Sequence, residues 1–276
     1  MPAKSVVLVV SAGAVLGLAL TGGVLGWAAG DPRTGAVSVA APAPSTMEPT
    51  PTAAPGPVDQ EFGVALTPPR LTGGSGPYGS IVNTGTAGVA LTFDDGPDPI
   101  WTPRILAALR AASVRATFCL IGAHAQDYPD LVRAIAADGH TLCNHSWNHN
   151  TALGSAGAAA IRADLSRTNA AIQAAVPDAT IAYFRQPGGF WTSTVVAVAQ
   201  DLGLAPLHWS VDPLDWSRPP VATLVASVTN GCRDGAVVLL HDGGGSRANT
   251  VDAVTRLLPA LARSYPLVAM PIGDEQ

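Results

Sequence analysis

Residues 88–97, which read GVALTFDDGP, decide how the rest of the chain is interpreted. The first half of this stretch is rich in Val, Leu, Thr and Phe and is stopped by a Gly-Pro pair, which predicts a short buried strand. Two adjacent carboxylates, Asp94 and Asp95, stand where this strand ends. The loops that leave strand tips carry the chemistry of parallel α/β proteins. Alone, the two acids indicate a solvated, helix-capping turn rather than a site, so their role depends on the sequence downstream.

Strand-like and helix-like segments alternate from Gly88 towards the end of the chain. Such alternation predicts an α/β protein with a mostly parallel sheet covered by helices. About seven strands fit either an incomplete barrel or a doubly wound sheet, and periodicity does not choose between them. The expected strands are residues 89–93, 116–120, 140–143, 181–184, 205–208, 237–240 and 267–269, and the expected helices are residues 103–112, 128–138, 158–175, 193–202, 220–229 and 250–263.

The chain has 276 residues and a net charge of −5, which suits one domain of moderate size plus additional segments. No basic stripe is visible, so nucleic acid is excluded as an expected partner. Residues 31–58 are rich in Pro, Ala and Thr and predict a disordered linker. Residues 59–86 predict an irregular lead-in, and residues 87–271 the folded domain.

Residues 1–30 predict a membrane-targeting segment. There is no charged residue between Lys4 and Asp31, and the apolar run is long enough to cross a bilayer as a helix. Lys4 favours an orientation with the remainder of the chain outside. Residues 28–30 read AAG and could be a cleavage site, so both an uncleaved anchor and a signal peptide stay open. Either way, we expect an extracytoplasmic protein, anchored at the cell surface or secreted.

A pair of histidines follows the third expected strand, in residues 140–149, which read HTLCNHSWNH. His145 and His149 lie on one face if this segment coils into a helical turn, and two imidazoles so placed suit zinc. The pair alone could equally be structural. With a carboxylate from the first strand it becomes a two-His, one-Asp set with positions left open for water and substrate.

Three further polar motifs stand at later strand ends. Residues 184–189 read FRQPGG, residues 209–216 read WSVDPLDW and residues 238–243 read VLLHDG. Each is ambiguous alone, because a plain turn explains it. Polar, metal-capable residues at five strand ends instead predict one site at that edge of the sheet.

The five motifs, in this order, resemble the polysaccharide deacetylase family (NodB homology domain, carbohydrate esterase family 4). The resemblance covers residues 87–271 and implies an irregular (β/α) barrel. It also implies a metal-dependent hydrolase that removes acetyl groups from glycans, with zinc as the first choice of cation and cobalt, nickel or manganese as alternatives. An acetylated polysaccharide is then the expected partner, with a membrane as a second if the N-terminal helix is uncleaved, and we expect a monomer.

Carried over residue by residue, the resemblance assigns each motif a role. The implied metal ligands are Asp95, His145 and His149, and the implied catalytic groups are Asp94 as general base, Arg185 orienting that base, His241 as general acid and Asp215 tuning His241. The implied substrate-binding residues are Pro187, Gly188, Trp216 and Leu239. The family usually has Tyr where this chain has Gly188, so the shape of the sugar site differs here. The backbone N–H that the family directs at the oxyanion is one that Gly also supplies.

The expected substrate is a polysaccharide that contains N-acetylglucosamine. Peptidoglycan is favoured over chitin, because an anchor and linker would hold the domain near its own envelope. An O-acetyl esterase on an acetylxylan-like glycan is one alternative, and a catalytically inactive glycan-binding protein is another. A two-His, one-carboxylate iron oxygenase is disfavoured by the Asp-first order and by the late His241.

Three cysteines, Cys119, Cys143 and Cys232, leave at least one thiol free. The first two fall on successive expected strands and could be close enough to form a disulfide, but the sequence does not give their separation. We expect buried free thiols that behave as small apolar residues.

Overall fold

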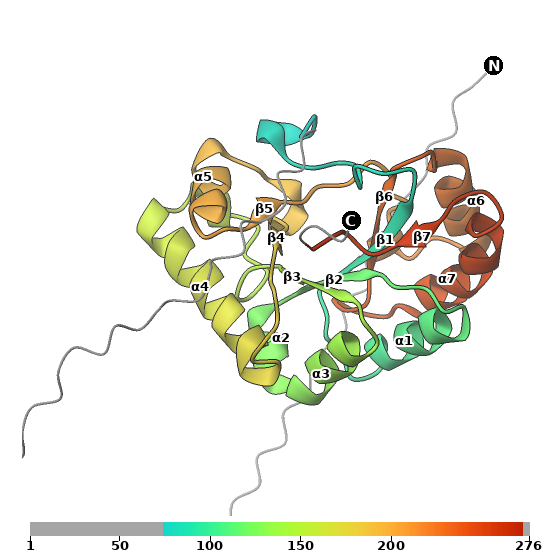
Figure 1. Cartoon of the computed structure of the whole chain (residues 1–276), viewed down its shortest axis with the longest axis horizontal. Helices are drawn as coiled ribbons and strands as arrows, with labels where there is room; N and C mark the ends of the chain where they lie inside the picture. Colours follow the sequence, from blue (N-terminus) through green and yellow to red (C-terminus); the bar gives the residue numbers. More distant parts are fainter. Residues whose placement is uncertain (1–73, 273–276) are drawn as a thin grey trace, which may run out of the picture. The chain divides into compact units, whose positions relative to one another are not determined.

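A computed structural model describes residues 74–272 (Figure 1). The predicted N-terminal helix of residues 1–30, the predicted linker of residues 31–58 and the first part of the lead-in lie outside the described residues, so they stay predictions. Between residues 74 and 272, no helix combines the length and the apolar character needed to cross a bilayer.

Within residues 74–272, seven strands form a single sheet in which every strand pairing is parallel, and this confirms the predicted irregular barrel. Their order is β5-β4-β3-β2-β1-β6, and β7 pairs with the beginning of β1. The strands are β1 (Val89–Asp94), β2 (Thr117–Leu120), β3 (Thr141–Asn144), β4 (Tyr183–Phe184), β5 (Ala205–Pro206), β6 (Val237–His241) and β7 (Leu267–Val268).

Helices cover the outside of the curled sheet (Figure 1). They are α1 (Thr102–Ala111), α2 (Gly122–Asp127), α3 (Pro129–Ala137), α4 (Ala158–Ala175), α5 (Ser193–Asp201), α6 (Val221–Gly231) and α7 (Ala248–Leu261). Short 3₁₀ helices are η1 (Pro77–Gly79), η2 (Leu153–Ser155), η3 (Pro187–Gly189) and η4 (Asp215–Ser217). The six-residue α2 escaped the sequence analysis because it is too short to show a helical apolar period.

The barrel is irregular because β5 and β6 are not paired directly. Isolated bridges span this gap instead, joining Ile81 to Leu207 and Asn83 to Ala236. Part of the lead-in therefore serves as a closing segment between the two edge strands. The third bridge, from Val211 to residue 238, brings the loop after β5 against β6.

Strand alternation explains why β1 carries both core and site residues. Val89, Leu91 and Phe93 belong to the apolar core between the sheet and the helices. The alternate side chains of Thr92 and Asp94 point into the barrel, where both contact the same arginine. The strand is buried along its whole length, as predicted, but its inner face is polar at the carboxyl end.

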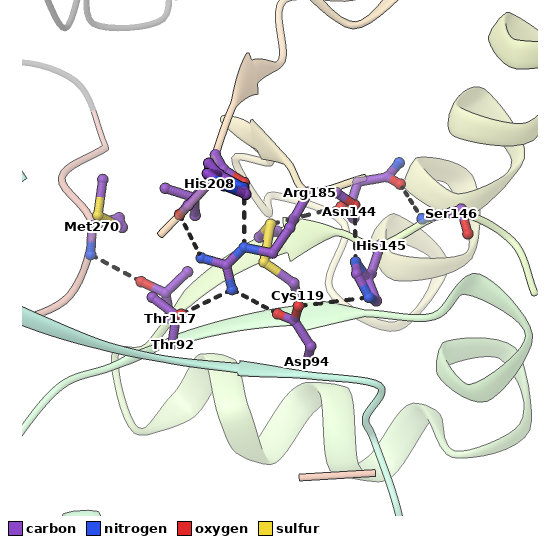
Figure 2. Close-up of a disulfide and its surroundings, with 12 residues drawn as sticks. Thr92, Asp94, Thr117, Cys119, Asn144, His145, Ser146, Arg185, His208 and Met270 are labelled. Carbon is purple, nitrogen blue, oxygen red and sulfur yellow. Dashed lines mark hydrogen bonds and ion pairs between the residues drawn. A yellow bond between two sulfur atoms is a disulfide. The ribbon is translucent and has the colours of Figure 1, made fainter. Parts of the chain in front are cut away.

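The expectation of three free thiols is wrong for one pair, because Cys119 and Cys143 form a disulfide inside the barrel (Figure 2). The two residues are direct partners in the parallel ladder between β2 and β3, so their side chains leave the same face of neighbouring strands. Only this register, which the sequence does not reveal, brings the sulfurs together. Cys232 is a buried free thiol, as expected.

Candidate active site

Asp94 and Asp95 face the same space although they are consecutive. Asp94 ends β1 and is buried, and Asp95 adopts a left-handed backbone conformation with φ of 73°. That conformation turns the chain, so the two side chains are not directed to opposite faces as they would be in a continuing strand. An oxygen of each carboxylate lies within 3.6 Å of Nε2 of His145.

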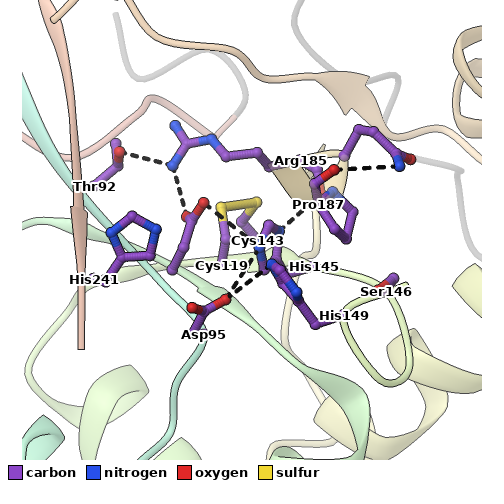
Figure 3. Close-up of polar contacts among 12 residues, drawn as sticks. Thr92, Asp95, Cys119, Cys143, His145, Ser146, His149, Arg185, Pro187 and His241 are labelled. Atoms are coloured by element: carbon purple, nitrogen blue, oxygen red, sulfur yellow. Dashed lines mark hydrogen bonds and ion pairs between the residues drawn. A yellow bond between two sulfur atoms is a disulfide. The ribbon is translucent and has the colours of Figure 1, made fainter. Parts of the chain in front are cut away.

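His145 and His149 come from the turn that follows β3, and the segment between them is not a helix. Ser146 and His149 both adopt positive φ, 65° and 57°, so a tight turn rather than the expected helical coil brings the rings together. The ring centroids lie 5.1 Å apart. Nε2 of His145 and Nε2 of His149 lie 3.5 and 3.3 Å from the same Oδ1 of Asp95 (Figure 3).

The three side chains fit a divalent cation. One ligand atom from each of Asp95, His145 and His149 can be chosen so that all lie within 4.8 Å of one another. Oδ1 of Asp95 is buried and has no hydrogen-bond partner among the described residues, which is costly unless a cation occupies that side. Nδ1 of His145 lies 2.8 Å from the Arg185 carbonyl oxygen. Donation of the Nδ1 proton there leaves Nε2 free to bind a metal.

The charges of this cluster depend on each other. Burial by itself would raise the pKa of Asp95, but the neighbouring ring of His145, together with the charges of His241 and His149, lowers it well below its usual range. Burial lowers the pKa of His149. The pKa of His145 is raised, because the neighbouring carboxylates and the Arg185 carbonyl outweigh burial. Asp95 is therefore ionised at neutral pH, and a cation bound here would displace the proton that the raised pKa favours on His145.

Arg185 holds Asp94 from the far side of the barrel. The guanidinium is fully buried, and Nη1 donates to Oδ1 of Asp94 over 2.7 Å and to Oγ1 of Thr92 over 2.8 Å. Its other nitrogens donate to the carbonyl oxygens of Leu207 and His208. Every nitrogen of this buried cation thus has a partner, which fixes the orientation of the Asp94 carboxylate.

His241 ends β6 and pairs with Asp215 of η4. Its Nδ1 lies 2.6 Å from Oδ1 of Asp215, and its backbone N–H donates to Oδ2 over 3.0 Å. Burial favours the neutral imidazole, but the hydrogen bond and charge of Asp215, with Asp94 and Asp95, raise the pKa of His241 to about 9. His241 is therefore protonated at neutral pH and can deliver a proton.

These groups meet at a pocket of about 480 Å³. Of the residues predicted to bind substrate, Gly188, Trp216 and Leu239 line it, whereas Pro187 is buried and does not. Arg185 and Asp215 lie behind the lining, where they contact Asp94 and His241. The lining residues are Asp94, Asp95, His145, His149, Gly188, Phe190, Trp209, Asp212, Leu214, Trp216, Leu239, His241, Gly244 and Arg247.

Because residue 188 is glycine, the ring of Phe190 can form this part of the pocket wall. Its φ of 64° favours glycine, and a Cβ added there would lie 2.7 Å from the ring of Phe190. The Phe190 ring, 63 % exposed, thus packs across the position that a side chain on residue 188 would take.

The sequence analysis missed several lining residues. Trp209, Asp212 and Leu214 fall in the quoted motif of residues 209–216, so that stretch already contained the signal, although none received a role. Phe190, Gly244 and Arg247 carry no sequence signal, because only the folding of two separate loops brings them to the pocket.

Comparison with known proteins identifies the family. A model described as polysaccharide deacetylase matches residues 82–207. A chitooligosaccharide deacetylase of Sinorhizobium fredii is 42 % identical over 199 residues, which are 68 % of this chain and 92 % of that protein. A peptidoglycan-N-acetylglucosamine deacetylase of Bacillus cereus is 37 % identical over 177 residues, 63 % of this chain and 82 % of that protein.

The fold comparison agrees. A family 4 carbohydrate esterase from Streptomyces lividans, solved in complex with acetate, superposes with a TM-score of 0.62 at 35 % identity. The match covers 67 % of this chain and 93 % of that structure. Sequence relatives matched over most of their length and a shared barrel together establish that the chain belongs to the polysaccharide deacetylase family, carbohydrate esterase family 4.

Proposed function

We propose that this member of the polysaccharide deacetylase family is a metal-dependent hydrolase that removes N-acetyl groups from polysaccharide containing N-acetylglucosamine. The observation that carries the proposal is one pocket in which three side chains that fit a cation, Asp95, His145 and His149, lie beside a separately held acid, Asp94, and the imidazole of His241. These are the groups that amide hydrolysis needs: a means to activate water, a stabilised oxyanion and a proton for the departing amine.

Asp95, His145 and His149 would hold the cation. Two imidazoles and one carboxylate suit zinc, so we propose zinc, with cobalt, nickel or manganese as alternatives. When bound, such an ion lowers the pKa of water and polarises a carbonyl group.

Asp94 acts as the general base. One of its oxygens is held by Arg185, so the other, Oδ2, stays directed towards the metal triad, 3.6 Å from Nε2 of His145. A carboxylate fixed in this way accepts a proton from the attacking water without first having to reorient.

His241 acts as the general acid. The tetrahedral centre collapses only if the amine nitrogen is protonated as the C–N bond breaks, because an amide anion is a very poor leaving group. Nδ1 of His241 faces Asp215, which leaves Nε2 to deliver the proton. The backbone N–H of Gly188 is the proposed oxyanion donor, where one such group is worth about 3 kcal/mol. Trp216 and Leu239 are proposed to line the space for the acetyl methyl.

Peptidoglycan is the proposed polysaccharide. The relatives named above include a chitooligosaccharide and a peptidoglycan deacetylase, so they support the amino-sugar class rather than one member of it. Support for peptidoglycan comes from the expected targeting segment of residues 1–30 and linker of residues 31–58, which would hold an extracytoplasmic domain near the envelope.

Acetate release tests the proposal directly. The full chain is incubated with N-acetylated chito-oligosaccharides, peptidoglycan and O-acetylated xylan, after treatment with a chelator and again after zinc is added back. We expect release from the N-acetylated glycans that is lost with chelation and restored by zinc. Release from xylan alone would identify an O-acetyl esterase, and no release from any glycan would identify an inactive binding protein.

A further inference from the structure

The turn that carries Asp215 is bounded by two left-handed residues that are not glycine. Asp215 begins the three-residue helix η4, and the residues on either side, Leu214 and Arg218, adopt left-handed backbone angles with φ of 57° and 60°. Neither is glycine, so each costs on the order of 1 kcal/mol, and such a turn persists only when its surroundings fix it.

Arg247, which precedes α7, and the first turn of that helix supply further support. Arg247 is buried and donates from Nη1 to the backbone carbonyl of Asp215 over 3.3 Å. Asn249 donates from its side-chain amide to the carbonyl of Pro219 over 2.9 Å. Thr250 donates from Oγ1 to Oδ2 of Asp215 over 2.8 Å. The first two contacts hold the backbone of this segment, and only the third reaches the carboxylate.

Among the described residues, the hydroxyl of Thr250 is the one donor to the Asp215 carboxylate that does not belong to His241. His241 donates from its ring and from its backbone N–H. Thr250 is 1 % exposed and Asp215 is equally buried, so water does not replace the hydroxyl if it is removed. Without that donor the buried carboxylate is less stable as an anion and draws the shared proton away from Nδ1 of His241.

We propose that Thr250 is a positioning residue for the general acid: its hydroxyl keeps Asp215 anionic, so that His241 stays a cation until Nε2 gives its proton to the departing amine. The proton thus passes from Nε2 to the amine nitrogen as the C–N bond breaks, and Asp215 keeps its charge throughout. This inference rests on the proposed role of His241 in deacetylation.

Two substrates with different leaving groups distinguish a role of Thr250 in positioning the general acid from a role in supporting the fold. An amine leaves only when it is protonated, whereas 4-nitrophenolate leaves an aryl ester without a proton. The carboxyls of Asp94, Asp95 and Asp212 also influence the charge of His241, and Arg247 lines the same pocket, so a pH profile alone would not identify Thr250. A weakened acid should slow the amide and leave the aryl ester unchanged.

The test compares Thr250→Val, which keeps the shape but removes the hydroxyl, with Thr250→Ser, which restores it. Each full-length variant is assayed with zinc on an N-acetylated chito-oligosaccharide and on 4-nitrophenyl acetate. We expect Thr250→Val to lower kcat on the amide about tenfold, as for one lost hydrogen bond to a charged group, and to leave KM and the ester rate within about twofold. Thr250→Ser should recover most of the amide rate.

Thr255→Val is the matched control. Thr255 lies on the same helix, but its hydroxyl is exposed and donates to the carbonyl of Val251. This variant should behave as wild type on both substrates. An equal loss of both activities in Thr250→Val, or a full amide rate, would overturn the assignment.

A second measurement does not depend on turnover. In the zinc-loaded protein, the proton between Nδ1 of His241 and Asp215 should give a strongly downfield NMR resonance, which shifts in Thr250→Val and not in Thr250→Ser. An unchanged resonance in Thr250→Val would overturn the inference. If wild type releases no acetate from the amide, the proposed function fails, and this resonance still decides the role of Thr250.

Discussion

The backbone carbonyl of Arg185 lies 2.8 Å from Nδ1 of His145, while the side chain of the same arginine donates to Asp94 over 2.7 Å. One residue therefore orients a proposed metal ligand through its main chain and the proposed base through its guanidinium. The two functions can be separated by mutation, because a side-chain substitution leaves the carbonyl in place.

Arg185→Met should reduce turnover without weakening cation binding. The Asp94 carboxylate would lose the partner that fixes its orientation, and we expect kcat to fall about 100-fold. The uncompensated buried acid should lower the free energy of unfolding by about 3 kcal/mol. Calorimetric zinc titration should give an affinity no lower than that of wild type. Full activity of Arg185→Met would show that Asp94 does not depend on the Arg185 guanidinium for its orientation.

The two adjacent acids should respond differently to the loss of charge. Asp94→Asn is expected to bind zinc within about threefold of wild type but to lose about 1000-fold in kcat, since it removes the proposed general base. Asp95→Asn is expected to weaken zinc binding itself, because its Oδ1 lies between the two imidazoles. Zinc titration and acetate release on both variants provide the comparison. Near-full turnover by Asp94→Asn would refute the assignment of the base.

Turnover should fall at alkaline pH as His241 loses its proton. The pKa of His241 is raised to about 9 in the folded protein from its usual 6.5. Its interaction with the neighbouring acids therefore stabilises the fold fully below pH 6.5, and this stabilisation is lost as the pH rises through 9. A bound cation offsets the charges of Asp94 and Asp95, so the descending limb of kcat should lie between these two values.

Asp215→Asn checks this interpretation of the alkaline limb. It removes the charge that favours the protonated imidazole, so the limb should move to lower pH by about one unit or more. A pH–rate profile of kcat on an N-acetylated oligosaccharide measures the shift. An alkaline limb that stays in place would mean that another group limits turnover.

The Cys119–Cys143 disulfide should stabilise the domain. It closes a loop with a sequence separation of 24, for which chain entropy gives about 3 kcal/mol. A Cys119→Ala/Cys143→Ala variant should lose stability of this order in urea unfolding, and reductant should destabilise wild type alone. Cys232→Ala is the control and should change stability by about 1 kcal/mol. Equal stability of wild type and the double variant would argue against a bridge.

Gly188→Ala should strain the pocket wall. The residue has a φ of 64°, and the added methyl would lie 2.7 Å from the Phe190 ring, so we expect a loss of about 1–2 kcal/mol. Phe190→Ala removes the contact but not the backbone strain. The double variant should recover only part of the loss, as a thermodynamic cycle of unfolding free energies would show. Full additivity would mean that the two residues do not touch.

The residues of the site could be predicted because they lie in short sequence motifs. Each motif places a polar residue directly after an apolar strand, and parallel strands deliver all such residues to one edge. Asp95, His145 and His149 are therefore found together although they come from segments about fifty positions apart. The ordered motifs also identified the family, which periodicity alone could not do.

Other features required the fold itself. The disulfide depends on the register of β2 against β3, which no local pattern records. The left-handed backbone of Ser146 and His149 forms a turn where spacing suggested a helix. Phe190, Arg247 and Thr250 reach the site from loops and a helix whose mutual packing decides their position.

The sequence by itself determined the parallel α/β architecture and the types of group available for chemistry, because strand periodicity and strand-end polarity are properties of short segments. Only the tertiary structure decided which atoms meet. The contacts of Arg185 with Asp94 and of Thr250 with Asp215 join residues 91 and 35 positions apart, and such pairings follow from packing over the whole barrel.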